Sequence, residues 1–236
     1  MRNIIDSVET LLGDLLVWIV LIPKTLVRGV AWPRSLPELV RSEVERQSSN
    51  RYNSYTPPGL FFLLAGVLPY VAGLYTFIPE LAAKQAGHLL YRRLAALSPE
   101  QALVVGFVYL ATLPVGASLV MCSFRHEPLS RSALKPILGI QAYCWGAVLL
   151  IGVYPMLIAD LVPAVRALRF LAVYWLWFIY QESVIVSVET KAKPFRAVII
   201  ALTSWCAAVV LAGAAQIALA LAIGGIPSSW LSSRAP

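Results

Sequence analysis

Four long stretches without a charged residue are the feature that most restricts what this chain can fold into. They cover residues 57–79, 102–124, 136–159 and 197–227. A helix needs about 20 mostly apolar residues to cross the hydrocarbon core of a bilayer, which is about 30 Å thick. Each stretch is long enough, and the whole chain is 59% hydrophobic and only 13% charged. We therefore predict an all-α, polytopic integral membrane protein.

A fifth span is predicted over residues 167–189. This segment carries Arg169, Gln181 and Glu182, but its centre, residues 170–180, is too hydrophobic for a loop. A crossing is also needed to connect its two neighbours. The sequence thus predicts a bundle of five transmembrane helices within residues 55–227, after an N-terminal region of residues 1–54 and before a short external tail, residues 228–236.

The distribution of positive charge predicts the orientation of the bundle. Thirteen of the 19 lysine and arginine residues lie in residues 1–56, 123–135 and 189–196. Loops rich in these residues stay on the cytoplasmic side of a membrane. We therefore expect a cell-membrane protein with a cytoplasmic N-terminus and an external C-terminus. Topology and anionic lipid explain the net charge of +7 more simply than nucleic acid does.

The N-terminal region has the pattern of an amphipathic helix. Between Ile4 and Ile19 the apolar residues recur at helical spacing, and acidic residues interrupt any signal-peptide core. We expect a helix over residues 4–31 in the cytoplasmic interface. Its candidate contacts to anionic headgroups are Lys24, Arg28 and Arg34. A helix packed on the protein's own cytoplasmic loops fits equally well, and a crossing by residues 4–23 is a minor alternative. A second short helix is predicted over residues 36–47, with Pro37 at its start.

Glu182 is the main candidate for a functional residue inside the membrane. An ionisable group in a bilayer costs several kcal/mol unless it is paired or hydrated. Gln181 is adjacent and could donate a hydrogen bond, while Lys191 and Lys193 lie within reach of helix tilt or snorkelling. The favoured interpretation is an interhelical hydrogen bond or ion pair near the cytoplasmic boundary. A proton or ion pathway is the alternative.

A stripe of small residues follows one face of the last predicted span. At four-residue spacing it contains Ala208, Ala212, Gln216, Ala220 and Gly224. Small residues allow close helix contact in lipid, and a glutamine can form a hydrogen bond across such a contact. The stripe is expected to face the chain's own bundle, with a second copy of the chain as the alternative.

Three short motifs resemble those of the Yip family of five-span membrane proteins, first known as partners of Rab-type GTPases. They are Tyr55-Thr56-Pro57-Pro58-Gly59-Leu60-Phe61-Phe62 at the first span, Ile140-Gln141-Ala142-Tyr143 in the third, and Lys193-Pro194-Phe195-Arg196-Ala197 before the fifth. The resemblance covers residues 55–225. It implies a cytoplasmic N-terminal region, five closely spaced spans and almost no external domain. The resemblance does not predict a Rab-type GTPase as a partner of this chain, because the chain has no recognisable GTPase-binding signature.

No set of residues predicts catalysis, a cofactor or a metal. Cys122, Cys144 and Cys206 form no Cys-x-x-Cys pair, and neither a phosphate-binding loop nor a dinucleotide fingerprint occurs. We therefore expect a non-enzymatic scaffold that organises membranes or binds partners. Its partners would be anionic membrane lipids, other membrane proteins or further copies of itself. A small transporter or channel using Glu182, with kinks at Pro69, Pro114 and Pro155, and an accessory subunit of a larger membrane complex are the alternatives.

Overall fold

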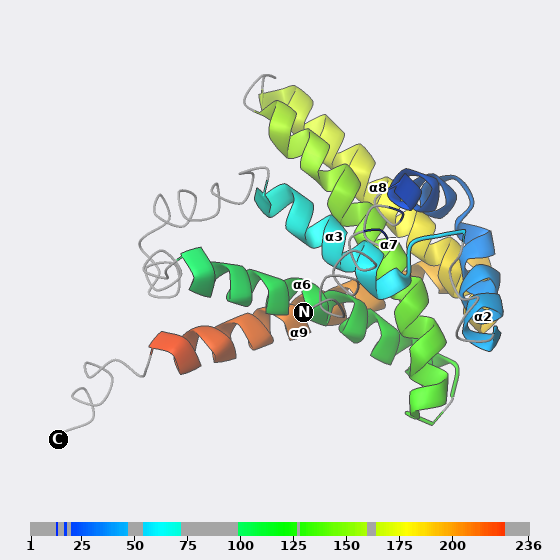
Figure 1. Cartoon of the computed structure of the whole chain (residues 1–236). Helices are drawn as coiled ribbons and strands as arrows, with labels where there is room; N and C mark the ends of the chain where they lie inside the picture. The colour runs from blue at the N-terminus through cyan, green and yellow to red at the C-terminus, as the bar shows by residue number, and fades with distance from the viewer. Residues whose placement is uncertain are drawn as a thin grey trace.

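The computed structural model describes residues 13, 17, 20–46, 54–71, 99–126, 128–159 and 164–224, and all regular structure in these ranges is helical (Figure 1). Residues 20–31 form a helix that leads into a short 3-10 turn, η1. In chain order the further elements are η1 (Pro33–Ser35), α2 (Leu36–Glu45), α3 (Pro58–Val71), α6 (Pro99–Phe124), α7 (Arg131–Ala159), α8 (Ala164–Thr190) and α9 (Pro194–Gly224).

Three of the described helices are long and apolar enough to cross a membrane. The segments that meet this condition are Val104–Phe124, Arg131–Gly152 and Pro194–Leu219. The apolar part of α3 that the structure describes, Pro58–Val67, is shorter. α8 coincides with the predicted fourth span but carries Gln181, Glu182 and Glu189 in its C-terminal half. The chain is thus a helical membrane protein with three candidate spans, and the count of five remains a proposal.

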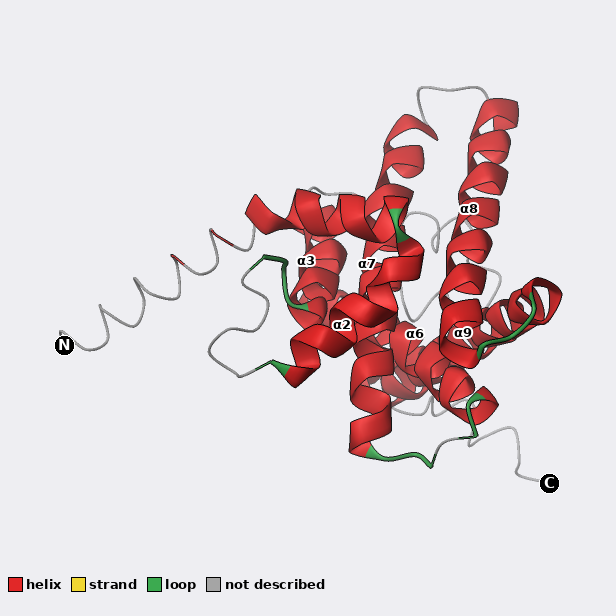
Figure 2. Ribbon diagram, turned by 90° about the vertical axis from the view of Figure 1, so that its right-hand side faces the viewer, coloured by secondary structure: helices red, strands yellow, loops and turns green. Residues whose placement is uncertain are grey.

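The long helices pack in pairs. α6 lies along α9, α3 lies against α7, and α8 touches both α7 and α9 (Figures 1 and 2). Aromatic and aliphatic side chains from these helices fill the core, including Phe61, Tyr143, Phe178 and Ile185. The short helices at the N-terminal end lie across α7 and α8 (Figure 2).

The small-residue stripe lets α6 and α9 approach closely. A Cβ atom added at Gly116 of α6 would lie 2.7 Å from the backbone Cα of Ala208. Ala208 and Ala212 are both fully buried, so this part of the stripe faces the chain's own bundle, as predicted. Gln216 is only half-buried and forms no hydrogen bond with the residues that the structure describes. The surroundings of Ala220 and Gly224 lie outside what the structure describes.

The second N-terminal helix is observed where the sequence predicts it. α2 runs from Leu36 to Glu45, with a proline in its first turn. Of the amphipathic helix expected over residues 4–31, the structure describes residues 20–31, which are helical, and two isolated positions before them. Most of residues 4–19, residues 72–98 with the end of the first predicted span, and the tail 228–236 lie outside the described residues.

Candidate functional site

Glu182 lies in a buried polar cluster built by three helices. Its Oε1 accepts a hydrogen bond of 2.7 Å from Nε2 of Gln141, and its Oε2 accepts one of 3.3 Å from the thiol of Cys144. The same Gln141 amide nitrogen lies 2.9 Å from the sulfur of Met121. Gln141 and Cys144 are three residues apart, so they share one face of α7. The cluster therefore joins α6, α7 and α8 through side chains that are all buried.

The interhelical hydrogen bond expected for Glu182 is observed, and it links α8 to α7. Lys191 and Lys193 are both exposed, and neither forms an ion pair with Glu182 in the described part of the chain. The side-chain carbonyl of Gln141 is also buried and has no hydrogen-bond partner among the described atoms. The cluster is thus held by neutral donors rather than by a neighbouring cation.

The predicted hydrogen bond from Gln181 to Glu182 is wrong. Gln181 donates instead to the backbone carbonyl of Val30, at 2.7 Å. Adjacent residues in a helix point in directions about 100° apart and do not face each other. Gln181 therefore attaches the N-terminal helix, residues 20–31, to α8, while Glu182 points into the bundle.

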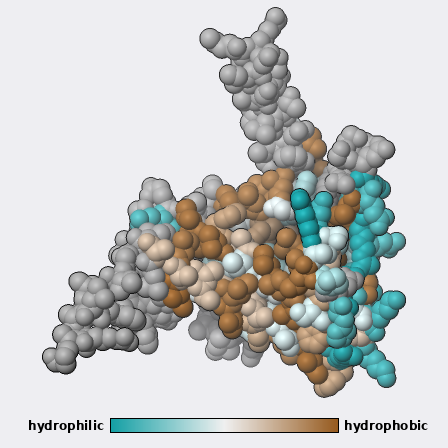
Figure 3. All heavy atoms as spheres, turned by 90° about the horizontal axis from the view of Figure 1, so that it is seen from below, coloured by the Kyte–Doolittle hydropathy of each residue, from teal (hydrophilic) through white to brown (hydrophobic). Residues whose placement is uncertain are grey.

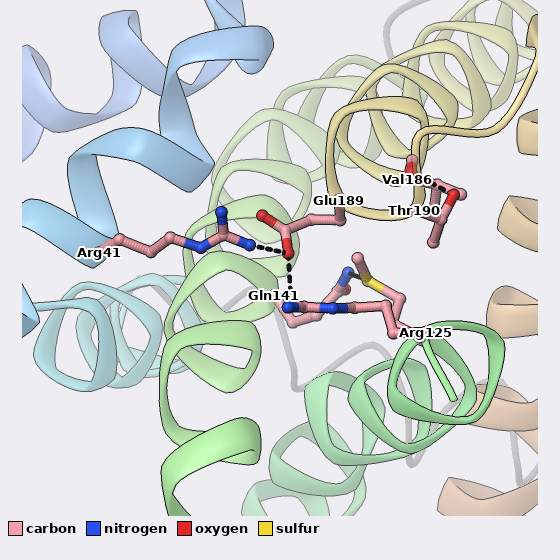
Figure 4. A network of polar contacts seen from close by, with 7 residues as sticks. Arg41, Arg125, Gln141, Val186, Glu189 and Thr190 are labelled. Atoms are coloured by element: carbon pink, nitrogen blue, oxygen red, sulfur yellow. Dashed lines mark hydrogen bonds and ion pairs between the residues drawn. The ribbon is translucent and has the colours of Figure 1, made fainter. Parts of the chain in front are cut away.

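A second polar site, which the sequence did not predict, is centred on Glu189 (Figure 4). Its Oε2 accepts hydrogen bonds from Arg41, at 2.6 Å, and from Arg125, at 2.7 Å. The Glu189 side chain is fully buried, whereas those of Arg41 and Arg125 are 43% and 18% exposed. The carboxylate thereby joins α2, the C-terminal end of α6 and the C-terminal end of α8. The only sequence signals were single charged residues, one in the middle of the short helix predicted over residues 36–47 and two at the ends of predicted spans.

Further hydrogen bonds fix the N-terminal region to the bundle. The Thr25 hydroxyl oxygen accepts from the backbone N–H of Thr56, at 3.0 Å, and the Tyr143 hydroxyl donates to the Thr56 carbonyl, at 2.6 Å. Together with the contacts of Gln181 and Glu189, they bring residues 20–46, 124–126 and 189–196 to one end of the bundle. We call these three segments the polar platform.

The predicted headgroup contacts lie on the outer side of the polar platform. Lys24 is exposed, with its Nζ 4.8 Å from the centre of the Tyr55 ring. Arg28 is half-buried, with its guanidinium carbon 5.9 Å from the centre of the Trp32 ring, and Arg34 is exposed. None of these basic side chains enters the Glu182 cluster, and neither does Gln216. The predicted site residues therefore divide into a buried set and a surface set.

Within the described ranges, no three or more histidine, cysteine, aspartate or glutamate side chains gather in a group that could hold a metal ion.

Comparison with known proteins finds no matching family model, no matching curated protein and no matching solved structure. The resemblance to the Yip family therefore rests on the three sequence motifs alone.

Proposed function

We propose that the chain is a non-enzymatic, Yip-like membrane protein with five spans that acts as a membrane-organising or partner-binding scaffold. The observation that supports this most is the polar platform. Segments from three distant parts of the sequence are joined there by the buried carboxylate of Glu189. A surface whose parts are fixed to one another is preorganised, and preorganisation reduces the entropic cost of binding a partner.

The proposed topology has the polar platform in the cytoplasm of the cell. The three segments that Glu189 joins belong to the three regions that contain most of the lysine and arginine residues. This arrangement agrees with the positive-inside rule, which assigns all three regions to the cytoplasmic side. The N-terminus is then cytoplasmic and the C-terminus external.

Residues 20–34 are the proposed lipid-facing part of the platform. Thr25 faces the bundle, while Val20, Val27 and Trp32 are 74%, 55% and 55% exposed. The exposed basic residues Lys24 and Arg34 lie beside these apolar side chains. Apolar side chains and a tryptophan flanked by basic residues are typical of helices in the headgroup layer. This segment is proposed to hold the platform against anionic lipid.

The second candidate is a small transporter or channel with Glu182 in its pathway. A buried carboxyl group inside an apolar bundle is a usual component of proton and ion pathways. The scaffold is favoured because both carboxylate oxygens of Glu182 are occupied by groups of α7, so that the residue contributes to helix contact.

A flux measurement separates the two candidates. We expect vesicles containing the purified chain to conduct protons and small cations no faster than protein-free vesicles, because both carboxylate oxygens of Glu182 are bonded to side chains of α7. Glu182→Gln, which keeps the shape of the side chain, should leave this background unchanged, as should Glu38→Gln on the exposed face of α2. A selective flux in the wild type that Glu182→Gln abolishes and Glu38→Gln preserves would contradict the scaffold proposal.

A further inference from the structure

The turn between α8 and α9 reverses the chain within three residues. α8 ends at Thr190 and α9 begins at Pro194. Lys191 adopts the left-handed backbone conformation, with φ of 52°, which is the usual way to end a helix. The Ser187 hydroxyl donates to the Ala192 carbonyl, at 3.2 Å, and closes the turn. The side chains that follow therefore start from a defined backbone.

The turn presents a compact, unneutralised group of positive charge. Lys191, Lys193 and Arg196 are all exposed, and none forms a salt bridge with an acidic side chain among the residues that the structure describes. The nearest acidic residue in the sequence, Glu189, is buried and already bound by Arg41 and Arg125. The turn thus lacks a counter-ion of its own.

An apolar stripe begins at the same turn and follows α9. Phe195, Ile199 and Leu202 are 79%, 47% and 39% exposed. Their spacing of four and then three residues places them on one face of the helix. Ala197, between them in sequence, is buried, so the opposite face enters the bundle. The exposed face therefore changes from basic to apolar within one helical turn.

The molecule as a whole has two adjoining surfaces of different polarity, with a boundary between them. Hydrophilic side chains gather at the end where α2 lies, and hydrophobic side chains cover the adjoining flank (Figure 3). In a bilayer that boundary is the level of the lipid phosphates, where basic and aromatic side chains are concentrated.

We propose that the α8–α9 turn binds the headgroup of an anionic phospholipid whose acyl chains lie along Phe195, Ile199 and Leu202. Lys193 and Arg196 bind the phosphate, and Lys191 adds to the local positive potential. Charge complementarity selects an anionic headgroup, and the apolar stripe directly below it selects a lipid over a soluble acidic partner. The site is separate from Lys24, Arg28 and Arg34. This proposal depends on the proposed function only in that the chain must span a bilayer. It does not depend on whether the chain transports ions.

The test uses the full chain in phosphatidylcholine vesicles containing a small fraction of spin-labelled phosphatidylglycerol or spin-labelled phosphatidylcholine. Electron paramagnetic resonance measures how much of each labelled lipid is immobilised by the protein. The wild type should prefer phosphatidylglycerol severalfold, and Lys193→Gln with Arg196→Gln should reduce that preference about threefold or more. The matched control is Arg131→Gln with Lys135→Gln, which removes two exposed charges at the start of α7 and should change the preference little.

Three outcomes would overturn the proposal. If the two double variants lose the phosphatidylglycerol preference equally, the preference depends only on the total charge at this end of the bundle. The absence of a phosphatidylglycerol preference in the wild type would exclude the site. Binding of a soluble polyglutamate peptide that depends on Lys193 and Arg196, without any lipid preference, would assign the turn to an acidic protein partner. None of these outcomes depends on the flux measurement, so the two proposals fail independently.

Discussion

Replacing Glu189 with glutamine should destabilise the bundle by about 2–3 kcal/mol. The variant would leave Arg41 and Arg125 without the carboxylate that both now bind. Removing one partner of a fully buried ion pair typically costs about 3–5 kcal/mol, because the remaining charge stays out of water. The expected value is lower here because Arg41 is 43% exposed and can recover part of its hydration. Unfolding of the purified protein in detergent measures the change.

The structural effect of Glu189→Gln should be concentrated in α2. Arg41 is the side chain through which α2 reaches Glu189, so hydrogen exchange should increase in residues 36–45 before it increases in α6 or α9. Glu38→Gln, on the exposed side of the same helix, should change stability by less than about 0.5 kcal/mol. If Glu189→Gln and Glu38→Gln lower the free energy of unfolding by the same amount, the Glu189 carboxylate does not hold the platform together.

Replacing Gly116 with alanine should separate α6 from α9 at their closest approach. The new Cβ would lie 2.7 Å from the Cα and 3.1 Å from the backbone nitrogen of Ala208. Both are backbone atoms, so the clash is relieved only by moving a whole helix. Overpacking of this kind typically costs about 1–3 kcal/mol. The gain in helix propensity from glycine to alanine, about 1 kcal/mol, offsets only part of this cost.

Gly106 provides a matched control in the same helix. A Cβ atom added there meets no atom of the described residues within 4 Å, apart from the backbone of its own helix. Gly106→Ala should therefore leave stability unchanged or increase it by up to about 1 kcal/mol, the opposite sign to Gly116→Ala. Thermal unfolding of both variants under the same conditions makes the comparison. Equal shifts in the unfolding temperature of the two variants would mean that α6 and α9 are not in contact at Gly116.

The approximate positions of the long helices could be predicted from the sequence, because a long apolar run in a membrane protein forms a helix. The predicted segment 102–124 corresponds to α6, and 197–227 corresponds to α9, which ends at Gly224. The prediction for α7 began too late, at residue 136. The helix starts at Arg131, where the Ser130 hydroxyl accepts a hydrogen bond from the backbone N–H of Ala133. A helix continues past the apolar region wherever a cap is available, so hydropathy alone underestimates its length.

The partners of the polar side chains could not be predicted from the sequence. Whether Gln181 or Glu182 faces the bundle depends on the rotation of α8 about its own axis, which packing against α7 and α9 sets. The Glu189 contacts join residues 148 and 64 positions apart in the chain, and no local pattern connects them. The small-residue stripe was more informative, because close approach needs a small side chain at every contact. Even so, it did not identify Gly116 as the position opposite Ala208.

The central claim is that one cytoplasmic platform is built from three parts of a five-span chain. Labelling single cysteines with a membrane-impermeant thiol reagent tests it most directly. Cys122 and Cys144 are buried, so Cys206→Ser gives a sufficient background. Cysteines at Ala31, Ser132 and Pro194, all exposed in the platform or beside it, should be labelled from the cytoplasmic side, and one at Ser232 from outside. Labelling of any platform position from outside, or of all four from one side, would contradict the account.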